Sequence, residues 1–138
     1  MIVILDTNIV MSAIFFSRTL TPIISHWASG SFKLALTKDI AEEYVDVYQR
    51  MSAKYVALME QTFQTILASA EYFEPTKLNK QICKDADDDI FLECALSAKA
   101  DFVVTGDKLL LAVGKIGLSE IIEARKFIDL LNNHPVKA

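Results

Sequence analysis

Short apolar runs rich in β-branched residues alternate along this chain with longer segments in which apolar residues recur at helical spacing. The run Ile2-Val3-Ile4-Leu5 is apolar throughout, as in strands that are buried on both faces of a parallel sheet. Strands that alternate with helices form a mostly parallel sheet with helices on both of its faces. The alternation therefore predicts an α/β protein with three α/β/α layers and a central sheet of about four to five strands.

The predicted elements follow one another without a linker or an internal repeat. We expect strands at 2–5, 32–36, 72–74, 101–104 and 121–122, and helices at 6–16, 21–30, 37–51, 53–70, 88–96, 108–111 and 124–131. The helices within 40–71 form a predicted hairpin that carries more apolar stripe than a small sheet edge can cover, so it is the best candidate for a partner surface. A chain of 138 residues, of which 52% are hydrophobic, fits one domain that spans 1–138.

Two acidic residues come directly after predicted strands. Asp6 follows the first strand, and Asp107 follows the strand at 101–104 and a Thr-Gly turn. An acid at a strand-to-helix turn is an ordinary helix cap, and this explains either residue taken alone. In open parallel sheets, however, binding sites form at the carboxyl ends of the strands, which is where both acids are expected to lie.

Helical spacing separates an inward acid from an outward acid in the predicted helix at 37–51. Glu43 lies three residues after Ile40 and four before Val47, so it belongs to the apolar stripe. Glu42 groups with Asp46 on the solvated side. A carboxylate on a buried face is unfavourable unless something pairs with it, so Glu43 is expected to have a partner.

The same reasoning applies to the acids around residue 88. Asp88 lies three residues before Phe91 and four before Leu92, so it continues the apolar stripe of its helix. Asp89 lines up with Glu93 and Ser97, and we expect this face to be solvated. The helix dipole favours an acid in the first turn, but it does not explain why Asp88 faces inward.

Convergence of these four acids at one edge of the sheet would require a positive counter-charge. Carboxylates that gather closely raise one another's pKa, and no basic residue lies on the same stripes to form ion pairs. Oxygen-rich ligand sets without sulfur suit Mg²⁺ or Mn²⁺. The pattern therefore predicts a divalent metal site made by Asp6, Glu43, Asp88 and Asp107.

Four segments together resemble the sequence motifs of the PIN domain. They are Asp6-Thr7-Asn8-Ile9-Val10, Ile40-Ala41-Glu42-Glu43-Tyr44, Asp85-Ala86-Asp87-Asp88-Asp89-Ile90-Phe91-Leu92 and Val104-Thr105-Gly106-Asp107. Each motif is weak by itself, but the four occur in the right order over nearly the whole chain. Within that family, the chain is similar to the VapC-type toxins of bacterial toxin–antitoxin systems.

This resemblance implies a Mg²⁺- or Mn²⁺-dependent endoribonuclease that forms homodimers and is inhibited by a partner antitoxin protein. The four acids would be its catalytic and metal-binding residues, because metal ions can activate water and stabilise a leaving oxygen without a protein nucleophile. Thr7, Asn8 and Thr105 would support these ligands by hydrogen bonds.

Basic residues that could guide an RNA backbone are few, and the net charge of −4 is unusual for a nucleic-acid-binding protein. Bound metal ions would supply positive charge locally and remove this objection. The candidates for substrate contacts are Arg18, Lys38, Lys84 and Lys108, with Arg50 and Lys54 as further possibilities.

Two alternatives remain open at this point. The chain could be a catalytically inactive binding module on a PIN-like scaffold, since a fold does not by itself settle function. It could also be a phosphatase of the haloacid dehalogenase type, but that chemistry needs a second Asp at the position that Asn8 occupies.

The sequence also indicates a cytoplasmic protein. No apolar run approaches the roughly 20 residues of a membrane span, and Ile2–Leu5 has neither the basic residues before it nor the cleavage site after it that a secretory signal needs. Cys83 and Cys94 are expected to be reduced thiols.

Overall fold

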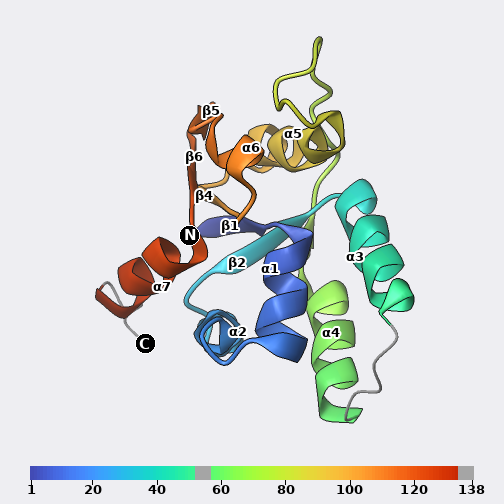
Figure 1. The fold of residues 1–138 in the computed structure, drawn as a ribbon, viewed down its shortest axis with the longest axis vertical. Coiled ribbons are helices and arrows are strands. Elements are labelled where there is room, and N and C mark those ends of the chain that lie inside the picture. The colour runs from blue at the N-terminus through green and yellow to red at the C-terminus, as the bar shows by residue number, and fades with distance from the viewer. Residues whose placement is uncertain (52–56, 134–138) are drawn as a thin grey trace.

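The computed structural model describes residues 1–51 and 57–133 and contains one mixed sheet with helices on both sides (Figure 1). Its strands are β1 (Ile2–Leu5), β2 (Lys33–Leu36), β3 (Glu71–Tyr72), β4 (Phe102–Val104), β5 (Lys115–Ile116) and β6 (Ser119–Ile122). The strand order is β3-β2-β1-β4-β6-β5, and every pairing is parallel except that of β5 with β6. The predicted three-layer α/β/α fold is confirmed.

The helical elements also follow the predicted order. They are α1 (Thr7–Met11), the π-helical turn η1 (Ser12–Phe16), α2 (Thr21–Ala28), α3 (Lys38–Arg50), α4 (Ala57–Ser69), the 3₁₀ turn η2 (Ala86–Asp88), α5 (Asp89–Ala98), α6 (Lys108–Leu111) and α7 (Ala124–Asn133). In Figure 1, α5 lies on one side of the sheet, while α1, α2 and α4 lie on the other. Because both faces are covered, the central strands consist almost wholly of buried apolar residues.

The two central strands bring the segments that follow them side by side. Leu5 of β1 is in register with Val104 of β4, and the Asp6 amide donates a hydrogen bond to the Val104 carbonyl at 2.9 Å. Asp6 and Thr105 therefore begin their turns next to each other at the carboxyl edge of the sheet. The helix α5 packs across this centre through Phe91 and Leu92, which are fully buried.

The structure has six strands, whereas the sequence predicted about four to five. The strand β5 was missed, because two residues are too short to show a period and an edge strand need not be apolar. Its hairpin with β6 turns at Gly117, where φ is +56° and an added Cβ would lie 3.0 Å from the Leu96 side chain. The strand β3 covers residues 71–72 instead of the predicted 72–74.

The helices α3 and α4 pack through Tyr48, whose ring centroid lies 4.8 Å from that of Phe63. The Tyr48 hydroxyl also donates a hydrogen bond to Glu60 at 2.7 Å. The first residues of the helix predicted at 53–70, and the candidate substrate contact Lys54, lie outside the described residues. Within the described chain, no single helix is long and apolar enough to cross a membrane. The helical segments 7–16 and 21–28 have the length and composition only when they are taken together, and they are bent by 95° at the break between them.

Candidate metal centre

Asp6 is buried at the end of β1, with 6% of its surface exposed. Its side chain makes no capping hydrogen bond of regular geometry to α1, although the amides of Thr7 and Asn8 lie close enough to lower its pKa. Instead, one carboxylate oxygen accepts a hydrogen bond from the Thr105 hydroxyl at 2.6 Å. Burial raises the pKa of Asp6 above its ordinary value of 3.8, and the nearby Asp107 adds to this, while the bond from Thr105 lowers it.

Asp107 follows β4 and caps α6, accepting hydrogen bonds from the amides of Leu109 at 2.7 Å and Leu110 at 3.3 Å. Its own amide donates to the Thr105 hydroxyl at 3.0 Å. Thr105 is fully buried, and its hydroxyl joins the two strand-end acids because it is hydrogen-bonded to the Asp6 carboxylate and to the Asp107 amide. Asp107 is therefore both a helix cap and a residue at the carboxyl edge of the sheet.

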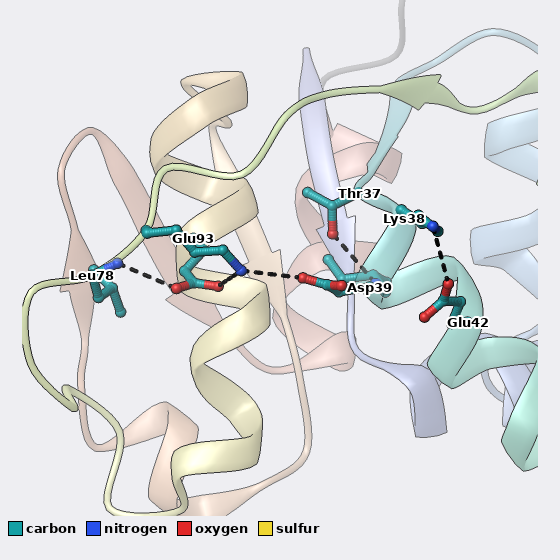
Figure 2. Close-up of polar contacts among 8 residues, drawn as sticks. Thr37, Lys38, Asp39, Glu42, Leu78 and Glu93 are labelled. Atoms are coloured by element: carbon teal, nitrogen blue, oxygen red, sulfur yellow. Dashed lines mark hydrogen bonds and ion pairs between the residues drawn. The ribbon is translucent and has the colours of Figure 1, made fainter.

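Glu43 lies on the inward face of α3, is half-buried and accepts a hydrogen bond from the Thr7 hydroxyl. Burial raises its pKa above the ordinary value of 4.5, and the charges of Asp6 and Asp87 add to the effect, partly offset by the bond from Thr7. Its neighbour Glu42 is exposed and pairs with Lys38 on the same helix at 3.9 Å (Figure 2). Helical spacing thus separated these adjacent acids correctly.

Asp88 is the last residue of η2 and sits immediately before α5. Its Oδ2 atom is buried and makes no hydrogen bond to any residue that the structure describes. Burial, followed by the charges of Asp6, Asp107, Asp85 and Glu43 in that order, raises the pKa of Asp88 to about 7. A buried carboxylate oxygen without a partner is rare in folded proteins and calls for an explanation.

These residues fit a hard divalent cation by donor chemistry and by charge. They offer only oxygen donors, and none of the four acids forms an ion pair within residues 1–51 and 57–133. In the same part of the chain, no three acidic, histidine or cysteine side chains are close enough to form a complete metal cage. The arrangement is therefore an electronegative cluster with one orphaned oxygen, more open than a closed metal site.

Several residues predicted to support or contact a substrate lie elsewhere. The Asn8 side chain is exposed and is not hydrogen-bonded to the acids. Arg18 lines a cavity with α2 residues such as Ser25 and His26, and Lys38 pairs with Glu42. Lys108 directly follows Asp107, while Lys84 lines a shallow cavity with Ile82 and Leu109 of α6. Of the described candidates, Lys108 adjoins an acid in the sequence, and Arg50 on α3 is near enough to Glu43 for its charge to lower the pKa of that acid.

The prediction of a solvated Asp89–Glu93–Ser97 face on α5 is wrong. Asp89 accepts hydrogen bonds from the amides of Ile82 at 3.0 Å and Cys83 at 2.7 Å. Glu93 accepts one from the Leu78 amide at 3.2 Å, and Ser97 donates one to the Glu74 carbonyl. The loop before η2 lies along this face, and its backbone groups need these partners, a demand that periodicity cannot reveal.

Sequence analysis also missed the role of Tyr44, which is fully buried beside the centre. Its hydroxyl donates a hydrogen bond to the backbone carbonyl of Leu5, the residue before Asp6. Burial raises the Tyr44 pKa well above 10, so the hydroxyl remains a donor at neutral pH. An aromatic residue on an apolar helical stripe usually only packs in the core, and nothing in the spacing distinguishes this one.

The sequence and the fold of this chain are each similar to those of known proteins. The sequence profile of the PIN domain matches residues 2–109. The fold is similar to that of a chain in the crystal structure of VapBC2 from Rickettsia felis bound to a DNA fragment from their promoter. The TM-score is 0.60 at 15% sequence identity, and the match covers 89% of this chain and 98% of that chain. No curated protein matches this chain by sequence.

Proposed function

The chain belongs to the PIN-domain family, and from this premise we propose that it is a Mg²⁺- or Mn²⁺-dependent endoribonuclease that hydrolyses phosphodiester bonds in RNA. The observation that carries the proposal is the orphaned Oδ2 of Asp88, buried among carboxylates that raise its pKa. A bound cation would pair with this oxygen and remove the repulsion within the cluster.

Asp6, Glu43, Asp88 and Asp107 would hold the metal. Bound Mg²⁺ or Mn²⁺ would supply positive charge and Lewis acidity, which favour attack of water on the phosphate and departure of the leaving oxygen. Thr105 would orient Asp6, to whose carboxylate it donates, and would fix the backbone at Asp107, whose amide donates to it.

The other residues of this chain would keep ligands and substrate in place. Thr7 would orient Glu43 through its hydroxyl. Outer partners of this kind matter because they fix the direction in which a ligand's lone pairs point. Lys108, which follows Asp107 in the sequence, and Lys84, which lines a cavity with Leu109 of α6, would attract the phosphate backbone, which the acids alone would repel.

The family and the fold likeness also support a place in a toxin–antitoxin module, with this chain as the toxin, a homodimer, and a protein antitoxin as its partner. The hairpin of α3 and α4 remains our candidate for a partner surface. Membership of the PIN family leaves the phosphatase alternative without support. The open spacing of the acids favours the second candidate, an inactive binding module.

Cleavage of a mixed single-stranded RNA tests the proposal. Wild type, Asp6→Asn, Asp88→Asn and the charge-matched control Glu42→Gln are each assayed with Mg²⁺, with Mn²⁺ and with EDTA. We expect metal-dependent cleavage by wild type and the control, and a loss of roughly a hundredfold or more in both Asp variants, since even outer partners of metal ligands are worth about 10- to 100-fold. Undiminished cleavage by Asp88→Asn, or the same rate in EDTA, would refute the proposal.

A further inference from the structure

The segment 74–78, called here the strap, connects β3 to the loop before η2 and lies along the polar face of α5. The Thr76 amide donates to the Glu93 carbonyl at 3.3 Å, and the Leu78 amide donates to the Glu93 carboxylate at 3.2 Å. Ser97 holds the beginning of the strap through the Glu74 carbonyl. These bonds fix the backbone on both sides of Lys77.

Lys77 reaches from the strap to two helices. Its Nζ lies 3.6 Å from a carboxylate oxygen of Glu93 on α5 and 3.4 Å from one of Asp39 on α3. In Figure 2, dashed lines that mark these ion pairs run from one nitrogen to a carboxylate oxygen of Asp39 on one side and of Glu93 on the other. The Glu93 side chain is only 12% exposed, so its pairing is less screened by solvent than that of most surface residues.

The two helices joined in this way are those that carry the inward acids. Glu43 lies one helical turn after Asp39 on α3, and Asp88 directly precedes α5. The charges of Glu43 and Asp88 repel each other, which favours separation of the two helices. A cation bound to both helices outside the acid cluster opposes that separation.

We propose that Lys77 is a positioning residue, which ties α3 to α5 and thereby sets the distance between the carboxylates of Glu43 and Asp88. The inference deepens the proposed function, because the tie would act on the affinity for Mg²⁺ or Mn²⁺. The Lys38–Glu42 pair cannot serve the same purpose, since both of its residues belong to α3. Because the strap holds the Lys77 backbone in place, less conformational entropy is lost in forming the two ion pairs than on a free surface.

Calorimetric titration with Mn²⁺ measures the effect on affinity. We expect Lys77→Met to raise the Mn²⁺ dissociation constant roughly threefold to fivefold, the range of an ion pair worth up to about 1 kcal/mol. The direction is informative, because removal of a positive charge by itself would tighten binding of a cation. Lys77→Arg should restore the wild-type value, since its guanidinium also pairs with carboxylates.

Lys80→Met is the matched control. Lys80 is exposed, lies three residues further along the chain and forms no ion pair with a described residue. The Lys80→Met substitution removes the same charge from the same loop, so the Mn²⁺ dissociation constant of this variant should equal or fall below that of wild type. Equal constants for Lys77→Met and Lys80→Met would overturn the proposal.

A double-mutant cycle separates the tie from general stability. If Asp39 acts through Lys77, adding Asp39→Asn to Lys77→Met should raise the dissociation constant no further. A purely structural role would instead lower the urea midpoint in EDTA while leaving the Mn²⁺ constant unchanged. Fully additive effects on the constant would contradict the tie.

A distance measurement in EDTA tests the tie even if the protein binds no metal. Spin labels at Gln49 on α3 and Ala86 on η2 occupy exposed positions, whereas the native Cys83 and Cys94 are fully buried. Lys77→Met should lengthen or broaden the distance distribution between the labels, and Lys80→Met should not. An unchanged distribution refutes the inference, whereas absence of Mn²⁺ binding by wild type refutes the proposed function.

Discussion

Carboxylates from α3 and the beginning of α5 occur in two neighbouring regions with opposite surroundings. In the strap region, which here means the strap together with the following loop up to Cys83, Asp39 and Glu93 share the ammonium group of Lys77. Asp89 accepts two backbone hydrogen bonds from that loop. In the acid cluster, Asp88 keeps a buried oxygen without a partner, and its closest charged neighbours are negative. The first region contains an ammonium group paired with two carboxylates, whereas none of the four acids of the second forms an ion pair with a described residue.

This difference distinguishes structural acids from candidate ligands better than burial does. Asp88 and Asp89 are adjacent and similarly half-buried, yet only Asp89 has hydrogen-bond donors to both of its oxygens. A protein rarely retains an unpaired buried carboxylate unless it serves a function. The ion pairs and hydrogen bonds of the strap region account for its acids, whereas the acid cluster keeps an unpaired oxygen that a cation would neutralise under the proposed function.

The largest effect on the acid cluster is expected from loss of the Thr105 hydroxyl, which joins two of its acids. Thr105→Val removes the donor to Asp6 and the acceptor for the Asp107 amide. We expect Mn²⁺ affinity to fall about 10- to 100-fold, as for other outer partners of metal ligands, when measured by calorimetry. Thr105→Ser keeps the hydroxyl and should remain close to wild type, and equal loss in both variants would contradict this role.

In the strap region, the corresponding change should affect stability more than metal binding. Asp89→Ala leaves the amides of Ile82 and Cys83 without acceptors. Urea unfolding in EDTA should show a loss of about 1–3 kcal/mol, because two partly exposed hydrogen bonds to a charged carboxylate are removed. Asp87→Ala, at an exposed neighbouring position, is the control. Wild-type stability of Asp89→Ala would contradict the structural role of this acid.

The smallest expected effect is the pH dependence of the metal-free protein. Burial and mutual repulsion raise the pKa values of Asp6, Glu43 and Asp88 in the folded state, that of Asp88 from 3.8 to about 7. The folded protein thus binds more protons than the unfolded chain between these values, so this contribution to stability is lost as pH rises from 3.8 to about 7. Solvent screening at the half-exposed Asp88 limits its size.

Urea unfolding in EDTA across this pH range measures the effect. Asp88→Asn should flatten the decline, because the amide does not titrate. A stability that rises steadily with pH in wild type would mean that the three acids are not repelling one another.

Much of the fold and the inward acids followed from periodicity alone. The runs at 2–5 and 101–104 located the central strands, and their ends located Asp6 and Asp107. Helical spacing assigned Glu43 and Asp88 to inward faces, because side-chain direction is fixed by the geometry of the element. These predictions depended only on local geometry and on the rule that parallel strands end together.

Features that depend on what another segment brings could not be predicted in this way. Asp89 and Glu93 looked like solvated residues, since nothing in their spacing announces a loop that will lie across them. The hydrogen bond from Thr105 to Asp6 depends on the neighbouring strand β1, which places Asp6 beside it. The strand β5 has two residues, which is too few to show a period, and the bounds of the equally short β3 were displaced by one to two residues.

In the proposed function, the acid cluster holds a divalent cation through Asp88. Calorimetric titration of wild type, Asp88→Asn and Glu42→Gln with Mn²⁺ near pH 7.5 tests it most directly, since the variants remove one acid each, from inside and outside the cluster. We expect saturable Mn²⁺ binding by wild type and Glu42→Gln, and loss of Mn²⁺ binding in Asp88→Asn. No binding by wild type, or equal binding by all three proteins, would contradict it.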